Sequence, residues 1–342
     1  MSETFLKTPF FLGDLELPSN IFCAPLAGCS DISFRHMMKV YRPGLVYCEM
    51  VKMDALVRHD PHTFRLLDYD KDLHPIGAQL CGSKKELAGP CAKIIESLGF
   101  DVIDLNCGCP VDKVTKDGSG SGLLKNPELI GEILHEMVRS VKIPVTVKIR
   151  LGWDHNSINA YEIAQIAEKA GAKAICIHGR TRSQGYVGPA NWDPIKEIKE
   201  NVKQIKVIAN GDIFDHVKAL QAFETTKCDA ILLARGTFGQ PWIVDDIYRF
   251  LKGENIIKKT ASDYKRSMIH HLNLIQSYQV PRKALLDMRR VCCWYLKKII
   301  GAKKLRESLN HCKNFDEAFT YINDFNWDEA EVNSTISCDY NQ

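Results

Sequence analysis

The chain has 342 residues, of which 45% are hydrophobic and 25% are charged, with a formal net charge of +3. The length suits a barrel of about 250 residues followed by a smaller module. The length excludes a small protein that depends on disulfide bonds, because so long a chain buries a large core. The 13 cysteines therefore fit a reducing compartment. No basic region precedes an apolar N-terminal stretch, and no window approaches about 18 uninterrupted apolar residues. We therefore expect a cytoplasmic protein without a signal peptide or membrane span.

Short runs rich in β-branched residues alternate with longer segments of helical periodicity, which is the pattern of parallel βα units. Helical periodicity is clearest in 84–99, 127–141 and 157–171, with Ser83, Asn126 and Asn156 or Ser157 as candidate N-caps. The β-type runs are 20–27, 45–51, 75–80, 101–106, 144–150, 172–178, 205–210 and 229–235. Eight such runs predict an α/β fold of the (β/α)8 TIM-barrel type. The alternative is a doubly wound sheet. Such a sheet usually has fewer strands and a GxGxxG turn after its first strand, and this sequence has no such turn after the first run.

The β-type runs stop after Trp242, and the rest of the chain has helical periodicity. We therefore expect a barrel domain over 1–242, a small all-α domain over 243–325 and a disordered tail over 326–342. Residues 1–246 hold 29 Lys and Arg against 31 Asp and Glu, whereas 247–325 hold 16 against 7. Such a basic excess favours a polyanionic partner, and the alternative is a solvated helix face.

Polar or small residues follow nearly every predicted strand, at the end where TIM barrels place their active sites. The seventh run ends in Asn210-Gly211-Asp212 and the eighth in Ala234-Arg235. Backbone N–H groups at such ends, together with a helix N-terminus, favour a phosphate group. Ordinary turns remain the alternative interpretation, because glycine is common in any turn.

Two polar residues lie within predicted strands. Lys148 requires an anionic or electron-rich partner if it faces inward, unless it lies at the outer end of the strand with its amino group in water. Gln79 can offer both a donor and an acceptor to a planar heterocycle, or close a local backbone hydrogen bond.

The stretch DLNCGCP places Cys107 and Cys109 one residue apart after the fourth run. Zinc sites usually take two close cysteine pairs and redox pairs have CxxC spacing, so we expect no metal site here. Strand alternation makes Cys107 a packing residue and leaves Cys109 on the loop above the barrel. A cysteine thiol is ordinarily protonated at neutral pH, so Cys109 is a candidate general acid. A nucleophilic role lacks an adjacent base, and the glycine- and serine-rich loop 113–124 is a candidate mobile cover.

Taken in order, these motifs resemble the tRNA-dihydrouridine synthases, flavoenzymes that reduce uridines in tRNA. The similar stretches, all within residues 15–325, are APLAGCSD, GAQL, NCGCPVDKV with GSGSGLL, VTVKIRLGW, IHGRTRSQGY, NGDI and ARGTFGQPW. The segment 287–306 is similar to the C-terminal module of the bacterial B-type branch. The chain departs from the family pattern at a few positions. The family often has Met where this chain has Leu26 and Cys107, and Gly where it has Ala234. A common Lys-His pair is replaced by Arg290-Val291.

The resemblance implies FMN in the barrel, NADPH or NADH as the electron donor, and tRNA as the partner. It matches Cys109 with the proton donor. The residues expected to contact FMN are Pro25, Leu26, Ala27, Gln79, Lys148, His178, Asn210, Gly211, Asp212, Ala234 and Arg235. The residues expected to contact the substrate are Asn106, Arg150, Arg180, Tyr186, Arg282, Lys283, Arg289 and Arg290.

The implied reaction passes a hydride from flavin N5 to uracil C6, while the Cys109 thiol protonates C5 and Lys148 stabilises negative charge on the flavin. Two alternatives are an FMN barrel that reduces a free pyrimidine or another small molecule, and a non-catalytic RNA-binding relative. The basic segment 281–306 favours the tRNA enzyme. We expect a monomer without a stable protein partner.

Overall fold

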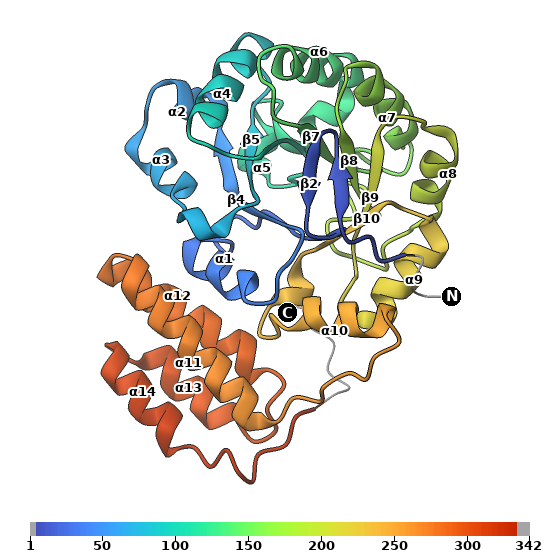
Figure 1. The fold of residues 1–342 in the computed structure, drawn as a ribbon. Coiled ribbons are helices and arrows are strands. Elements are labelled where there is room, and N and C mark those ends of the chain that lie inside the picture. The colour runs from blue at the N-terminus through green and yellow to red at the C-terminus, as the bar shows by residue number, and fades with distance from the viewer. Residues whose placement is uncertain (1–4, 334–342) are drawn as a thin grey trace.

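The computed structural model describes residues 5–333, and its centre is a closed barrel of eight parallel strands (Figure 1). Neighbouring strands follow the order β10-β3-β4-β5-β6-β7-β8-β9. The strands are β3 (Ile21–Cys23), β4 (Leu45–Lys52), β5 (Ile76–Cys81), β6 (Val102–Cys107), β7 (Val145–Arg150), β8 (Ala174–His178), β9 (Lys206–Asn210) and β10 (Ala230–Leu233). Each coincides with one of the eight predicted runs, and the predicted TIM barrel is confirmed.

Helices surround the barrel (Figure 1). They are α1 (Ile32–Lys39), α2 (Met53–Val57), α3 (Pro61–Leu67), α4 (Lys85–Ser97), α5 (Asp112–Thr115), α6 (Pro127–Val138), α7 (Ala160–Lys169), α8 (Asp193–Asn201), α9 (His216–Thr226) and α10 (Ile243–Leu251), with short 3-10 turns η2 (Lys71–Leu73), η3 (Gly120–Lys125) and η4 (Arg235–Thr237). Asn126 caps α6 as predicted, because its side chain accepts the N–H of Leu129 at 3.2 Å. The other caps are wrong: α4 follows Lys84 and α7 follows Asn159, while the Ser83 hydroxyl donates to the Asp117 carbonyl at 2.7 Å.

An N-terminal hairpin that the sequence analysis did not find closes the amino end of the barrel. Its strands β1 (Phe10–Leu12) and β2 (Leu15–Leu17) are antiparallel and three residues long, too short for a periodic signal. Phe10, Leu12 and Leu17 share an apolar cluster with inward residues near the strand starts, such as Phe22. The amino end is therefore sealed by packing, and the open end is the carboxyl end.

Strand alternation sorts the residues of β6 between two environments. Ile103, Leu105 and Cys107 belong to the large apolar cluster between the strands and the helices. Asp104 and Asn106 face inward, where they hydrogen bond to residues of β5 and β7. The barrel interior therefore changes from an apolar layer near the hairpin to a polar layer near the carboxyl ends.

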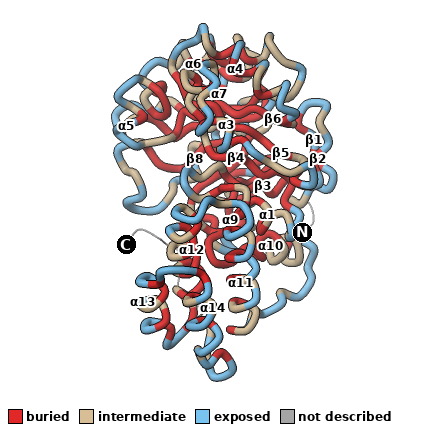
Figure 2. Tube along the Cα trace, turned by 90° about the vertical axis from the view of Figure 1, so that its left-hand side faces the viewer, coloured by how far each residue is buried: buried red, intermediate tan, exposed pale blue. Residues whose placement is uncertain are grey.

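The C-terminal helices form a layer of their own beside the barrel (Figure 1). They are α11 (Ala261–Tyr278), α12 (Pro281–Leu296), α13 (Lys303–His311) and α14 (Phe315–Asp324), which fits the predicted all-α segment. One apolar cluster runs through both parts: Phe34 of α1 lies edge-on to Trp294 of α12, and Figure 2 shows buried residues continuing from the strands into α11 and α12. The division at residue 242 stays a prediction, and α10, just beyond it, packs against α9 of the barrel.

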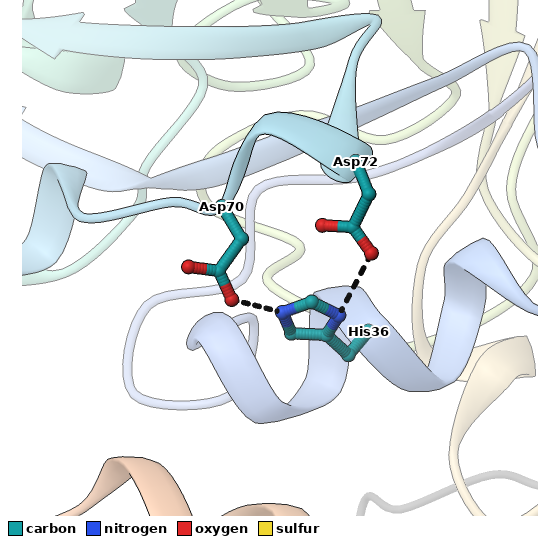
Figure 3. Close-up of side chains that lie close together, drawn as sticks. All are labelled: His36, Asp70 and Asp72. Atoms are coloured by element: carbon teal, nitrogen blue, oxygen red, sulfur yellow. Dashed lines mark hydrogen bonds and ion pairs between the residues drawn. The ribbon is translucent and has the colours of Figure 1, made fainter.

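A polar contact also joins the two parts. Tyr278, at the end of α11, stacks on His36 of α1 with ring centroids 5.1 Å apart, and its hydroxyl donates to Asp70 at 2.5 Å. The His36 ring lies between two carboxylates, 2.8 Å from Asp70 and 3.9 Å from Asp72 (Figure 3). The Tyr278 and His36 hydrogen bonds lower the pKa of Asp70. These side chains therefore form hydrogen bonds with one another across the junction between α11 and the barrel.

The tail expected to be disordered from residue 326 is ordered as far as it is described. The Trp327 side chain is 6% exposed, and its indole donates to the Ile322 carbonyl at 2.6 Å. Val332 bridges Ile299 after α12, because the chain returns along the end of that helix. The expectation is therefore wrong for 326–333, and the rest of the predicted tail, 334–342, lies outside the described residues. Within residues 5–333, every helix is too short or too polar to cross a bilayer.

The buried imidazole of His271 leads to a prediction about stability. It is 3% exposed on α11, 3.3 Å from the Tyr295 hydroxyl, and burial lowers its pKa to about 4. The unfolded chain, with an ordinary histidine, binds the extra proton below a pH of about 6.5, so acidification favours unfolding. The free energy of unfolding should therefore fall by about 1.4 kcal/mol per pH unit from this group between those two values.

Denaturant titrations of the wild type and His271→Gln, at pH 7 and at intervals down to pH 5, measure this slope. The free energy of unfolding should depend less steeply on pH in the variant. His178, whose pKa is also lowered, contributes in the same direction to both proteins. Equal slopes would show that His271 is protonated in the native state.

Candidate active site

A cavity of about 470 Å³ lies at the carboxyl ends of the strands, the location predicted for the site. The predicted residues that line it are Pro25, Leu26, Ala27, Gln79, Asn106, Cys109, Lys148, Arg150, His178, Tyr186, Asn210, Gly211, Asp212, Ala234 and Arg235. A larger groove of about 1200 Å³ lies outside the barrel between α4, α6 and α7. Its lining residues all lie on these outer helices or directly after them, distant from the strand ends, so we place the site in the smaller cavity.

Asn106, the last inward residue of β6, holds the loop that carries Cys109. Its Oδ1 accepts the backbone N–H groups of Gly108 at 3.1 Å and Cys109 at 2.9 Å. Its Nδ2 donates to Gln79 Oε1 at 2.8 Å. The two predicted ligand-facing amides, Gln79 and Asn106, are therefore bonded to each other, and the Cys109 loop is hydrogen bonded to the barrel wall.

The two cysteines of DLNCGCP have separate environments, as predicted. Cys107 is fully buried between β6 and the helices, and that burial raises the pKa of its thiol well above the ordinary value. Cys109 is half-buried and lines the cavity. The pair therefore consists of a packing residue and a residue at the candidate site.

Part of the loop expected to be a mobile cover supports Cys109, and its mobility stays a prediction. Ser121 is fully buried, and its N–H and hydroxyl both donate to the Cys109 carbonyl, at 3.0 and 2.9 Å. Gly120 has φ +59°, and a Cβ there would lie 2.9 Å from the same carbonyl. The glycines and serines thus serve close packing in η3, a role that composition alone does not distinguish from flexibility.

Arg150 and Arg180 organise loops at the mouth. Arg150 donates to the carbonyls of Gly108, Thr181 and Gly185, each at 2.9 Å, and burial lowers its pKa to about 10, which leaves it charged at pH 7. Arg180 lies behind the wall, where it pairs with Asp212 at 2.7 Å. Its guanidinium is therefore used within the protein. The expected contact of Arg180 with the substrate stays a prediction.

The side chains of β7 and β8 give the cavity a basic wall. The pKa of His178 lies well below 6.5, because the ring is buried and near Arg150, Lys148 and other cations, so the imidazole is neutral at pH 7. Burial also lowers the pKa of Lys148. Tyr186 remains 46% exposed, with the guanidinium of Arg235 4.3 Å from its ring centroid. Neutral and cationic donors therefore face one cavity.

Bare backbone forms the side of the cavity at β9 and β10. Gly211 has φ +113°, and a Cβ there would approach the His178 ring at 2.9 Å. A Cβ on Gly236 would lie 2.2 Å from the Ile213 carbonyl oxygen. Asn210 donates to the Leu232 carbonyl at 2.8 Å, which ties the two strand ends together. A side chain at either position would collide with the protein, so only glycine allows this close packing at the side of the cavity.

The four basic residues predicted on α12 lie outside the cavity. Lys283 and Arg290 both pair with the buried carboxylate of Asp287, at 2.6 and 2.8 Å. Arg289 donates to the Cys312 carbonyl at 2.6 Å. Arg282 is exposed. Part of the basic cluster therefore stabilises the helical layer, and the expected contacts with substrate stay predictions.

The cavity also has lining residues that the sequence analysis did not select, mostly apolar ones such as Cys29, Met50, Ile213, Phe214 and Phe238. Phe238 stacks on Trp294 of α12, with ring centroids 4.1 Å apart and planes at 2°. Phe238 lies within the quoted motif ARGTFGQPW, so its position after the eighth run was the available signal. Through this stack, the helical layer supports one wall of the cavity.

The comparisons with known proteins cover nearly the whole chain. The family model described as dihydrouridine synthase (Dus) matches residues 22–331. A "Probable tRNA-dihydrouridine synthase" of Rickettsia conorii is 37% identical over 301 residues, 87% of this chain and 91% of the relative. A "tRNA-dihydrouridine synthase B" of Pasteurella multocida is 35% identical over 300 residues, 87% of this chain and 90% of the relative.

Among solved structures, a complex of 2-naphthoyl-CoA reductase with 2-naphthoyl-CoA matches with a TM-score of 0.57 and 13% identity. The match covers 74% of this chain and about half, 53%, of that chain, and it supports the fold alone.

The closed barrel, with its polar cavity at the carboxyl ends, has the architecture of TIM-barrel enzymes. Within that class, the chain belongs to the dihydrouridine synthase (Dus) family, as the motifs indicated.

The contrast between the two cysteines can be measured directly. Brief treatment of the native protein with iodoacetamide at pH 7.5 should modify Cys109, because its thiol borders the cavity, and should leave the fully buried Cys107 unmodified. Peptide mass spectrometry reports each site, and the same reaction in denaturant should modify both. Equal labelling of the two cysteines in the native protein would contradict their placement.

Proposed function

We propose that this protein reduces uridines in tRNA to 5,6-dihydrouridine, with FMN in the barrel mouth and NADPH or NADH as the electron donor. The relatives named tRNA-dihydrouridine synthase support the reaction. The observation that carries the proposal within this chain is the Cys109 loop. A thiol lies at a cavity that also holds a lysine, a neutral imidazole and three amides.

The residues present fit FMN. Gly211, Arg235 and Gly236 line one side of the cavity, and glycine backbone beside a guanidinium suits a phosphate and the chain that bears it. Gln79 and Lys148 would hold the ring system, because an amide and a cation suit its heteroatoms. FMN supplies the hydride that reduces the C5–C6 bond of the uracil when it is bound.

The remaining chemistry belongs to the side chains of this protein. The Cys109 thiol supplies the proton for uracil C5, so that a hydride and a proton together saturate the double bond. Asn106 orients the Cys109 loop through its two backbone hydrogen bonds. The cationic Lys148 stabilises negative charge that develops in the cavity, and the neutral His178 offers a hydrogen bond without adding charge.

The mouth of the cavity suits a base presented by a large nucleic acid. A uridine must leave its stack to enter, at a cost of a few kcal/mol, and the half-exposed Tyr186 ring offers a stacking surface. The excess of Lys and Arg in 247–325 supports contacts with phosphates. This charge favours tRNA over a free pyrimidine as the substrate.

Replacing the thiol tests the proton donor. Cys109→Ala should bind FMN and tRNA as the wild type does, while dihydrouridine formation falls by a factor of roughly 100 to 10,000, the usual contribution of a general acid. Liquid chromatography with mass spectrometry of digested tRNA measures the product, and the flavin spectrum measures the cofactor. Cys107→Ala is the matched control and should retain activity, because that thiol only packs. A normal yield from Cys109→Ala would contradict the role of this residue.

A charge on α12 tests the tRNA surface. Arg282→Ala should weaken tRNA binding and reduce the slope of log K against log salt by about one, because one phosphate contact is lost. Lys142→Ala is the control, since this exposed lysine precedes β7 at the closed end of the barrel. Filter binding at several salt concentrations distinguishes the two. Identical slopes for all three proteins would place the tRNA elsewhere.

A further inference from the structure

A buried carboxylate with no part in the proposed chemistry lies beneath the cavity. Asp104, in the middle of β6, is 4% exposed and faces the barrel interior. It lines a small internal space of about 10 Å³ together with Tyr47, Thr146 and Lys148. A buried acidic side chain costs free energy unless hydrogen bonds compensate it, so its partners indicate what it does.

Asp104 is the starting point of a hydrogen-bond chain that ends at Cys109. One carboxylate oxygen accepts from the Thr146 hydroxyl at 2.6 Å, and the other accepts from Gln79 Nε2 at 2.7 Å. Gln79 Oε1 then accepts from Asn106 Nδ2 at 2.8 Å. Asn106 Oδ1 accepts the Cys109 N–H at 2.9 Å. The chain spans β7, β6 and β5 and leaves the barrel through the loop after β6.

The carboxylate sets the direction of the bonds at its end of this chain. An ionised Asp104 only accepts, so the NH₂ group of Gln79 must point toward it and the carbonyl must point toward Asn106. Asn106 then presents its NH₂ to Gln79 and its oxygen to the Cys109 backbone. Rotating the Gln79 amide by 180° would set oxygen against carboxylate and NH₂ against NH₂. At the other end, the N–H groups of Gly108 and Cys109 can only donate to Asn106 Oδ1, so both ends of the chain require the same orientation.

We propose that Asp104 is a positioning residue that fixes the amide orientation of Gln79 and, through Asn106, the loop that carries Cys109. The inference rests on the proposed function for what Gln79 and Cys109 do there. Asp104 itself lies one layer below the cavity and is not among its lining residues. Its effect on the reaction is exerted through Gln79 and Asn106, which both line the cavity.

Asp104→Asn tests the role with nearly unchanged volume. Asparagine keeps one acceptor oxygen but loses the charge, and its NH₂ group can turn toward Gln79, so the Gln79 amide is no longer held in one orientation from this end. We expect the FMN dissociation constant to rise roughly tenfold or more, the effect of losing a hydrogen bond to a charged group. We also expect iodoacetamide to modify Cys109 several-fold faster in the flavin-free full-length protein, because its loop is less firmly held.

Thr146→Val is the matched control. It removes the other hydrogen bond to the same carboxylate and leaves the Gln79 bond in place. A merely structural role for the buried polar layer predicts similar effects from both variants. The positioning role predicts that FMN binding and Cys109 labelling change in Asp104→Asn and stay near the wild type in Thr146→Val.

Gln79→Met provides a second test if Asp104→Asn does not fold. It breaks the chain between Asp104 and Asn106 without changing the carboxylate, and it should raise the Cys109 labelling rate by a similar factor. The double variant Asp104→Asn with Gln79→Met should add little to that factor, because both changes break one chain. Additive effects would contradict the chain.

The outcomes separate this inference from the proposed function. A wild type that binds no FMN would contradict the proposed function, and the labelling rates would still report on Asp104. A wild type and an Asp104→Asn variant with equal FMN affinity and equal Cys109 labelling would overturn the positioning role and leave the proposed function intact.

Discussion

The closed ring of eight parallel strands is the constraint on which the rest of the structure depends. Because side chains alternate along each strand, every second residue must face the barrel axis, and strand pairing aligns these residues in layers. Near the hairpin β1–β2 the layer is apolar, with Phe22 and Leu45. Nearer the carboxyl ends it contains Gln79, Asp104 and Lys148. The site is the polar end of a stack whose apolar end is sealed.

Buried polar groups in that end compensate one another before any ligand arrives. The Asp104 carboxylate has two donors, and Arg150 donates to three backbone carbonyls of two loops. Arg180 pairs with Asp212. These interactions hold the loops that carry Cys109 and Tyr186, so much of the charge near the site serves to preorganise it.

The helical layer is part of the same folded unit as the cavity wall. Trp294 of α12 stacks on Phe238, which lines the cavity, and the buried Asp287 gathers Lys283 and Arg290 on the same helix. A cluster of positive charge in the sequence is therefore divided between internal ion pairs and exposed residues such as Arg282. Contacts made by α12 with a large substrate would act on a helix that also supports the cavity wall.

The sequence by itself determined the barrel, because eight β-branched runs separated by helical periods have few other solutions, and its motifs supplied most of the polar residues that line the cavity. It also separated Cys107 from Cys109 by strand alternation. The tertiary structure decided what depends on distant partners: the three-residue hairpin, the packed segment 326–333, the supporting role of Ser121 and the internal pairing of Arg180. Periodicity records which face a residue occupies, whereas only the folded chain brings a carboxylate such as Asp104 to an amide 25 residues away.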